Sequence, residues 1–456
     1  MALGMQAVRE KTPDLKRRSM PRAKRAAMIG IPIFFILAIT GSASFGLVLA
    51  ALIFFALYIP AWDVLPLGKW VIPIAVLLIA VLYPIYQPNL FDVLVFGNFP
   101  SVDTGVTMMI FIMMALGLNI VVGYAGLIDL GYVAFYAMGA YTVAWFASQH
   151  FSGVTVHVGG VGVAPSTPGF HISIWLVVII AGIFATISGV LIGFPTLRLR
   201  GDYLAIVTLG FGEIMPQIAV NGDNLFGHNI TNGSQGINPI DPPGFGNRLN
   251  SAVGLPTDFL SSPNSTRLFY WTALFLVVVT AFCCWRMRDS RIGRAWIAIR
   301  EDETAAAAMG VPLMRTKTWA YAGGAFFGGV AGAYYGSFKG GTFPSDFYFN
   351  ISVFILCMVI LGGMGNIWGV IVGAAFLSYL NQEGLANIGA WMNANGVSDF
   401  VFRKQIDVPL YTSGIFGVIL VLTMLFRPEG LIPSERRKHE FKEGVHDQPL
   451  YDVTHE

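Results

Sequence analysis

Long hydrophobic runs separated by short polar segments dominate the chain. A helix that crosses a bilayer needs about 20 mostly apolar residues. Runs of this length predict spanning helices over 70–86, 102–122, 127–148, 172–194, 203–220, 268–287, 318–338 and 410–426. Two further stretches, 28–59 and 349–380, are interrupted by glycines, and each predicts a pair of helices. The pattern predicts an all-α fold, a polytopic transmembrane helical bundle of about 10–12 spans with broken helices.

The positions of the basic residues predict which loops lie in the cytoplasm. Segments 1–27, 195–202, 286–317 and 427–456 hold 22 of the 28 Lys and Arg residues, and such segments stay inside. Loops 87–103 and 149–171 have none and 221–267 has two, so we expect all three outside. With both termini inside, the number of crossings is even, and twelve satisfies every loop. Ten also fits if 28–59 is one long span and 123–148 re-enters from outside.

Composition excludes several classes of protein. Hydrophobic residues make up 55% of the 456 residues and charged residues 12%, which excludes a disordered chain and a soluble globular one. The basic N-terminus and the apolar run after it resemble a secretory signal, but a second apolar run follows and favours retained spans. Cys283, Cys284 and Cys357 lie in apolar runs without metal-ligand spacing, so we expect apolar fillers.

Glycines recur every four residues in two of the predicted spans. This spacing places them on one helix face, where another helix can approach closely. It predicts tight helix packing at Gly324, Gly328, Gly332, Gly336, Gly365, Gly369 and Gly373.

Segment 123–141 combines several glycines with one carboxylate, Asp129. A helix that is unwound beside a translocation path has this composition, and an intramembrane carboxylate is a candidate for function. The alternative is that Asp129 caps a helix at an interface. Glu213, within another predicted span, either pairs inside the bundle or contacts a polar path. The candidate path residues are Gly126, Asp129, Gly131 and Glu213.

Segment 288–311 is cytoplasmic and predicts a short helix with small residues along one side. Such a surface can fit a groove of a partner protein, and an amphipathic helix lying on the membrane is the alternative. The candidate coupling residues are Gly293, Arg294, Ile299, Arg300, Glu301, Asp302, Glu303, Ala305, Ala306 and Gly310.

The chain has neither a phosphate-binding Gly-x4-Gly-Lys-Ser/Thr motif nor a metalloprotease or serine hydrolase motif. We therefore expect a chain that is not an enzyme and has no catalytic residues, no metal site and no ATPase site. A stand-alone secondary transporter or channel would need coupling carboxylates inside the bundle, for which Asp129 and Glu213 are the clear candidates.

Residues 293–310 resemble the coupling loop of bacterial ABC-importer permeases for branched-chain amino acids. The stretches 123–141, 194–214, 361–369 and 426–431 are similar to the same family, and the N-terminal extension resembles its M-type subunit. The coupling loop of ABC importers in general reads Glu-Ala-Ala-x3-Gly, whereas here Thr304 follows Glu303 and Gly310 lies seven residues after Glu303. The resemblance covers residues 28–433 and implies a two-span extension at 28–69 and a permease core at 70–433, with an external loop at 221–267 and a cytoplasmic coupling loop at 288–317. The charge pattern adds a basic cytoplasmic tail at 1–27 and a cytoplasmic tail at 434–456.

The resemblance also implies partners and a location. The partners would be a homologous second permease, two cytosolic ATPase subunits, a periplasmic binding protein and the lipid bilayer of the bacterial inner membrane, with no nucleic acid. ATP and Mg would be bound by the ATPase subunits, and this chain would bind no cofactor. The substrate class would be branched-chain, or a broader set of, amino acids. Urea and short-chain amides are the alternative, because their permeases share the architecture.

Overall fold

The computed structural model describes residues 68–87, 99–197, 202–225, 227–246, 256–260, 262–394, 408–426 and 430–432, and only the backbone of 68–75 and 202. The predicted N-terminal tail, the spans at 28–59 and the C-terminal tail lie outside these residues. The chain divides into a first unit, Met1–Ser101 with Ala390–Val397, and a second unit, Val102–Gly389 with Ser398–Glu456. In the first unit, the Tyr83 hydroxyl donates a hydrogen bond to the Pro100 carbonyl oxygen (2.6 Å).

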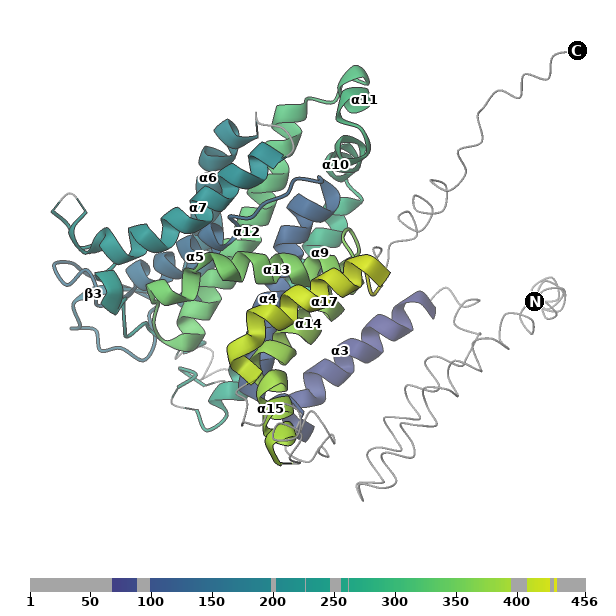
Figure 1. The fold of residues 1–456 in the computed structure, drawn as a ribbon. Helices are drawn as coiled ribbons and strands as arrows, with labels where there is room; N and C mark the ends of the chain where they lie inside the picture. The colour runs from purple at the N-terminus through teal and green to yellow at the C-terminus, as the bar shows by residue number, and fades with distance from the viewer. Residues whose placement is uncertain are drawn as a thin grey trace, which may run out of the picture. The chain divides into compact units, whose positions relative to one another are not determined.

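Helices dominate the described part of the chain, as the hydrophobic pattern predicts (Figure 1). They are α3 (Gly68–Tyr86), α4 (Val102–Leu118), α5 (Val133–Phe146), α6 (Ile174–Thr196), α7 (Asp202–Asn221), α9 (Ser265–Arg288), α10 (Arg291–Glu301), α11 (Glu303–Ala308), α12 (Leu313–Lys339), α13 (Phe349–Gly362), α14 (Ile367–Tyr379), α15 (Leu385–Ala394) and α17 (Thr412–Phe426). The π-helical turns η3 (Asn119–Tyr124) and η7 (Leu380–Gly384) extend α4 and α14. Short 3-10 helices cover Gly222–Asn224, Gly233–Gln235, Pro344–Phe347 and Val408–Tyr411.

Five helical segments within the described ranges are long and apolar enough to cross a membrane. They are Val102–Tyr124, Ile174–Thr196, Tyr203–Asn224, Ser265–Arg288 and Val408–Phe426. With the shorter apolar helices α5 and α13, they confirm an all-α polytopic membrane fold. The apolar stretch 349–380 is two helices, as predicted, but the second continues through η7 and α15 to residue 394.

The predicted span 127–148 is wrong in its first part. Residues 125–132 are turns and irregular chain, and α5 begins only at Val133. Gly126 has a φ of +70°, which interrupts a right-handed helix. The Asp129 carboxylate accepts a hydrogen bond from the Gly131 N–H, a donor that a continuous helix would use itself. With 14 residues, α5 is about 21 Å long, less than the hydrocarbon thickness of about 30 Å.

Helix α12 packs against α4 and α5 through its glycines. A Cβ added to Gly324 would lie 2.5 Å from Val121 Cγ2, and one added to Gly336 would lie 2.9 Å from Val143 Cγ1. One added to Gly332 would collide with the Tyr136 carbonyl oxygen. Glycine is therefore required where these backbones approach, as the four-residue spacing predicts.

The second glycine ladder differs in its first member. A Cβ on Gly373 would lie 2.6 Å from the Gly362 Cα, and one on Gly369 would collide with the Gly362 carbonyl oxygen, so α13 and α14 pack backbone to backbone. Gly365, however, lies before α14, in the turn between the two helices. Its φ of +86° suits glycine there, and its N–H donates to Asn119 Oδ1 (2.8 Å).

The side on which each end of α4 lies follows from its contacts. Helices α4 and α9 run parallel, because Gly105 lies against Tyr270 and the Leu116 carbonyl lies by Cys284 Sγ (3.8 Å). α9 leads directly into the basic segment 286–317, and Gly123 contacts that segment. Residue 123 is therefore on the basic side, which contradicts the ten-span alternative in which 123–148 re-enters from the opposite side.

A small sheet lies in the segment that joins α5 to α6, and sequence analysis did not predict it. Strands β1 (Ala147–Ser148), β2 (Thr155–Val158) and β3 (Gly169–Ile172) take the order β1-β3-β2. β1 and β3 are antiparallel, and β2 and β3 are parallel.

Candidate functional site

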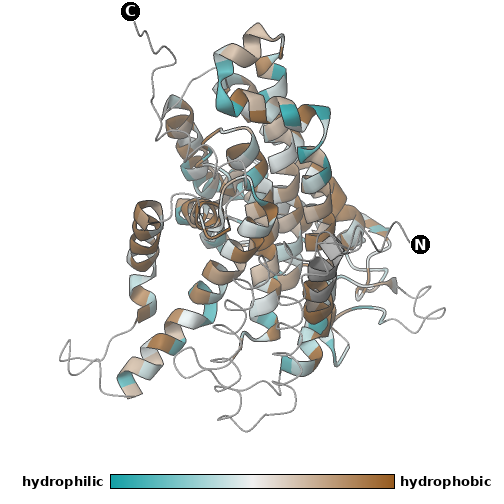
Figure 2. Ribbon diagram, turned by 90° about the vertical axis from the view of Figure 1, so that its right-hand side faces the viewer, coloured by the Kyte–Doolittle hydropathy of each residue, from teal (hydrophilic) through white to brown (hydrophobic). Residues whose placement is uncertain are grey.

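Helix α10 is anchored to the end of the bundle by its buried side. The Ser290 side chain caps it by accepting the Gly293 N–H (3.1 Å). Trp296 is buried, and its indole N–H donates to the Thr316 carbonyl at the start of α12 (2.8 Å). In Figure 2, hydrophilic residues gather at the end of the bundle that holds α10, whereas the long helices are mostly hydrophobic.

The predicted single helix of this segment is wrong, because α10 ends at Glu301 and α11 begins at Glu303. Asp302 between them is extended, with φ −154° and ψ 112°. Its carboxylate accepts hydrogen bonds from the Thr304 hydroxyl (2.5 Å) and from the N–H groups of Thr304 (2.8 Å) and Ala305 (3.0 Å). The hydroxyl, followed by the two amides, lowers the pKa of Asp302 below its usual value. Asp302 is thus the N-cap of a second helix.

The ten candidate coupling residues divide by exposure. Those that face the protein interior are Gly293, Ile299 and Ala306, while Arg300 and Glu303 are partly exposed. Those on the surface are Arg294, Glu301, Asp302, Ala305 and Gly310. Met309, which is not one of the ten candidates, is 85% exposed immediately after α11. The small alanines and this apolar side chain form a surface that water solvates poorly.

Lys317 fixes the beginning of α11 to α12. Its ammonium lies 2.8 Å from Glu303 Oε1, and the Lys317 side chain is only 5% exposed. A buried lysine requires such a partner. The two residues are 14 positions apart, which is no helical spacing, so the sequence alone carried no signal for this pair.

Arg300 joins the basic segment to the end of the first core span. Its Nη1 donates a hydrogen bond to the Gly123 carbonyl oxygen in η3 (2.6 Å). The stem of Arg300 also passes Gly126, where an added Cβ would lie 2.8 Å from Arg300 Cγ. Arg300 therefore connects α10 directly to residues 123–126, where the irregular chain before α5 begins.

Asp129 lies within that irregular chain and is 1% exposed. Its Oδ1 accepts the Gly131 N–H (2.9 Å), whereas Oδ2 is buried without a hydrogen-bond partner in the part of the chain that the structure describes. The Tyr321 hydroxyl of α12 interacts electrostatically with this carboxylate. Asp129 therefore holds a turn two residues ahead of α5 from a buried position.

The candidate path residues do not all lie together. Gly126, Asp129 and Gly131 share the irregular segment, and Gly131 packs so tightly on α7 that a Cβ would collide with the Thr208 carbonyl oxygen. Glu213, by contrast, is exposed on α7 and does not pair within the bundle among the described residues.

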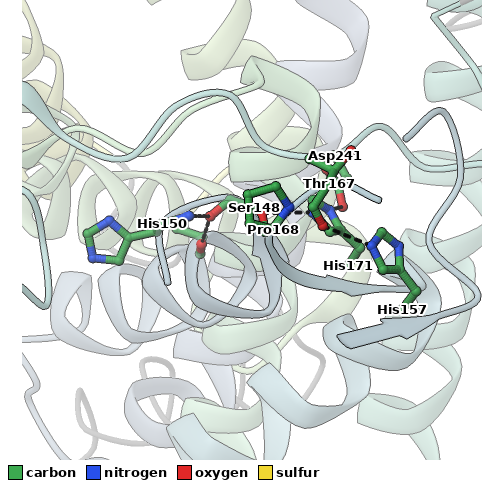
Figure 3. A network of polar contacts seen from close by, with 8 residues as sticks. Ser148, His150, His157, Thr167, Pro168, His171 and Asp241 are labelled. Carbon is green, nitrogen blue, oxygen red and sulfur yellow. Dashed lines mark hydrogen bonds and ion pairs between the residues drawn. The ribbon is translucent and has the colours of Figure 1, made fainter. Parts of the chain in front are cut away.

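A polar network secures the opposite end of the bundle (Figure 3). His171 of β3 is fully buried, and its Nδ1 lies 2.7 Å from Asp241 Oδ2 in the segment after α7. The His157 ring stacks on that of His171 with 4.6 Å between centroids, and its Nε2 lies 3.0 Å from the Thr167 carbonyl oxygen. Burial raises the pKa of Asp241 and outweighs the opposing effect of its hydrogen bond to His171.

No group of three or more His, Cys, Asp or Glu side chains among the described residues could hold a metal ion. Cys283, Cys284 and Cys357 are free thiols. Cys284 and Cys357 are buried and Cys283 is partly exposed, in agreement with their prediction as apolar fillers.

Residues 102–424 match the family described as branched-chain amino acid transport system, permease component. The chain is 37% identical over 359 residues to the high-affinity branched-chain amino acid transport system permease protein LivM of Escherichia coli K12, covering 76% of this chain and 73% of that protein. It is 26% identical to the probable LivM permease of Methanocaldococcus jannaschii, covering 72% and 91%. The permease protein LivH of Salmonella typhimurium is 25% identical over 48% of this chain and 64% of its own length. No solved structure matches the chain.

Proposed function

Because this chain belongs to the branched-chain amino acid ABC transporter permeases, as an M-type member, we propose that it forms half of the path of an ATP-driven importer. A homologous second permease completes the path, two cytosolic ATPase subunits drive it, and a periplasmic protein delivers the substrate. The substrate class is branched-chain amino acids or a broader set of amino acids. The LivH-type relatives support a second permease, because this chain is similar to both types.

The surface of α11 is the observation that carries this proposal. Met309 is 85% exposed at the basic end of the bundle, beside small exposed alanines and the Asp302 cap. An ATPase subunit with a complementary groove covers this surface, because a short helix with small residues and one apolar side chain fits such a groove. Closure of the two ATPase subunits then moves α10 and α11.

Arg300 supplies the mechanical connection from that surface to the substrate path. Its hydrogen bond to Gly123 and its contact with Gly126 transmit displacement of α10 to the segment that contains Asp129 and Gly131. Energy enters this chain through these contacts, so ATP and Mg are bound by the partner subunits and this chain binds no cofactor. Gly126, Asp129, Gly131 and Glu213 line or border the path.

The location follows from the family and the apolar helices, which support a multi-pass protein of the bacterial inner membrane. The ends of α9 and α12 that flank 286–317 face the cytoplasm because that segment is rich in arginine. By the same rule both termini are cytoplasmic.

The experiment that tests this function is ATP hydrolysis in proteoliposomes that hold the chain with the permease and ATPase subunits encoded beside it. Purified binding protein is added with leucine, isoleucine, valine, a polar amino acid or urea. Stimulation by the three branched-chain amino acids is the expected result. Stimulation by urea alone would replace the substrate class, and transport by the purified chain without ATPase subunits would refute the importer.

A further inference from the structure

Helix α7 turns one face away from the rest of the protein. Leu204, Thr208 and Ala219 are buried on its inner side. On the opposite side, the residues that point outward recur every three or four positions: Tyr203, Ile206, Gly210, Glu213, Gln217 and Asn221. A Cβ added to Gly210 would meet nothing within 4 Å. The outward face is apolar up to Gly210, and from Glu213 onward it carries the polar Glu213, Gln217 and Asn221 beside the exposed apolar side chains of Ile214, Ile218 and Val220.

This face differs from the outward faces of the neighbouring spans. On α6 the exposed side chains are all apolar: Leu176, Ile179, Ile183, Phe184, Ile187, Leu191, Phe194 and Pro195. On α9 the exposed side chains are Phe275, Val278, Val279, Phe282 and Trp285, with the charged Arg286 only in the last turn. Such faces suit lipid. Glu213 lies about 17 Å along α7, near its middle, where a carboxylate in contact with lipid is strongly unfavourable.

The inner side of α7 holds the segment with Asp129. The Thr208 hydroxyl accepts a hydrogen bond from the Leu130 N–H (3.1 Å), and a Cβ on Gly212 would lie 3.3 Å from the Leu130 carbonyl oxygen. The inner side of α7 is therefore held against the irregular segment 125–132, which Arg300 contacts at Gly126.

We propose that the outer half of α7 is one wall of a water-filled solute path, with Glu213 contacting the ammonium group of the amino acid in transit. This rests on the proposed import of amino acids. A zwitterion needs an anionic partner for its ammonium group, and no Lys or Arg within α7 competes for this carboxylate. Gln217 and Asn221 continue the polar face to the external end, where the Asn221 amide donates to the Gln217 carbonyl (2.8 Å).

Cysteine accessibility tests the wall directly. In the complete complex, with Cys283, Cys284 and Cys357 replaced by alanine, single variants Gln217→Cys and Asn221→Cys are treated with a positively charged, membrane-impermeant methanethiosulfonate reagent. Ile183→Cys and Ile187→Cys on α6 are the matched controls. We expect the α7 variants to react at least about tenfold faster, because thiolate forms in water and not in lipid, and saturating leucine to slow them. Rates equal to those of the α6 controls would overturn the proposal, because they would mean that Gln217 and Asn221 face lipid or pack against the second permease without water.

Glu213→Gln tests the ammonium contact, because it keeps the side-chain shape and removes the charge. We expect the KM for leucine uptake to rise at least about tenfold, as expected for a lost charge-assisted contact. Asp103→Asn, which neutralises an exposed carboxylate in the first turn of α4, should leave KM unchanged. An unchanged KM in Glu213→Gln would overturn the assigned contact.

These results distinguish the proposed water-filled face of α7 from the proposed import of amino acids. Leucine uptake by the cysteine-free parent tests import itself. If that parent takes up leucine while the α7 cysteines react like the α6 controls, the wall is wrong and the importer stands. If the α7 cysteines react but no amino acid is transported, the proposed function is wrong and the water-filled face stands.

Discussion

Loss of the Arg300 side chain should uncouple ATP hydrolysis from substrate without unfolding the protein. Arg300→Ala removes the 2.6 Å charge-assisted hydrogen bond to the Gly123 carbonyl. Such a bond contributes about 1.5–3 kcal/mol. If this hydrogen bond stabilises the conformation in which α10 moves together with η3, its loss shifts the equilibrium between the coupled and uncoupled conformations by about 10- to 150-fold. We expect leucine-stimulated ATP hydrolysis in proteoliposomes to fall by a factor in this range while basal hydrolysis persists.

A double-mutant cycle identifies the route. Gly126→Ala introduces a Cβ 2.8 Å from Arg300 Cγ, at a φ of +70°. Gly340→Ala is the matched control, because its φ of +71° imposes similar backbone strain and a Cβ there meets nothing within 4 Å. If Arg300 and Gly126 act through one contact, the double variant should be no worse than the more damaging single variant.

Two results would refute this reasoning. One is additive losses in Arg300→Ala and Gly126→Ala, which would mean that the two residues act independently. The other is an equal loss in Arg286→Ala, which removes the same charge from an exposed position on α9. That result would assign the effect to net charge on the cytoplasmic surface.

Three further predictions concern packing, capping and pH. Gly332→Ala should destabilise the purified chain by at least about 1–3 kcal/mol in thermal unfolding, because its Cβ collides with α5, whereas Gly417→Ala on α17 meets open space and should not. Asp302→Ala should lower substrate-stimulated ATP hydrolysis and Asp302→Asn should largely preserve it, because asparagine also caps helices; equal losses would mean that charge matters and capping does not. The raised pKa of Asp241 means that the folded state binds its proton more tightly than the unfolded state. Its contribution to stability should therefore fall as pH rises from the ordinary carboxyl value of about 3.9 through the raised one, and Asp241→Asn should remove this slope in pH-dependent unfolding.

Much of the helical framework could be predicted because it depends on local pattern. Hydropathy located α6 and α9 to within a few residues, and the four-residue glycine spacing identified the α12 face that contacts α4 and α5. These features follow from bilayer thickness and helix geometry alone. The family resemblance likewise rests on contiguous motifs.

The features that were missed depend on contacts between distant residues. The end of α4 takes a π-helical turn beside a hydrogen bond from Gly365 to Asn119, 246 positions apart. The inward direction of Arg300 depends on Gly123, 177 positions away. The division of the coupling segment at Asp302 could have been predicted, because Asp is a preferred N-cap residue, but the helical periodicity through 295–309 favoured one continuous helix.

Uptake of leucine into proteoliposomes tests the central claim most directly. Vesicles hold the chain, the second permease and the two ATPase subunits, and binding protein loaded with labelled leucine is added on the periplasmic side. ATP is supplied at the face of the ATPase subunits, and it is replaced in parallel by a non-hydrolysable analogue or by a proton or sodium gradient. We expect leucine to accumulate when ATP is supplied but not with the analogue or an ion gradient, and we expect this accumulation to be lost in Arg300→Ala. Accumulation driven by an ion gradient without ATP would contradict it.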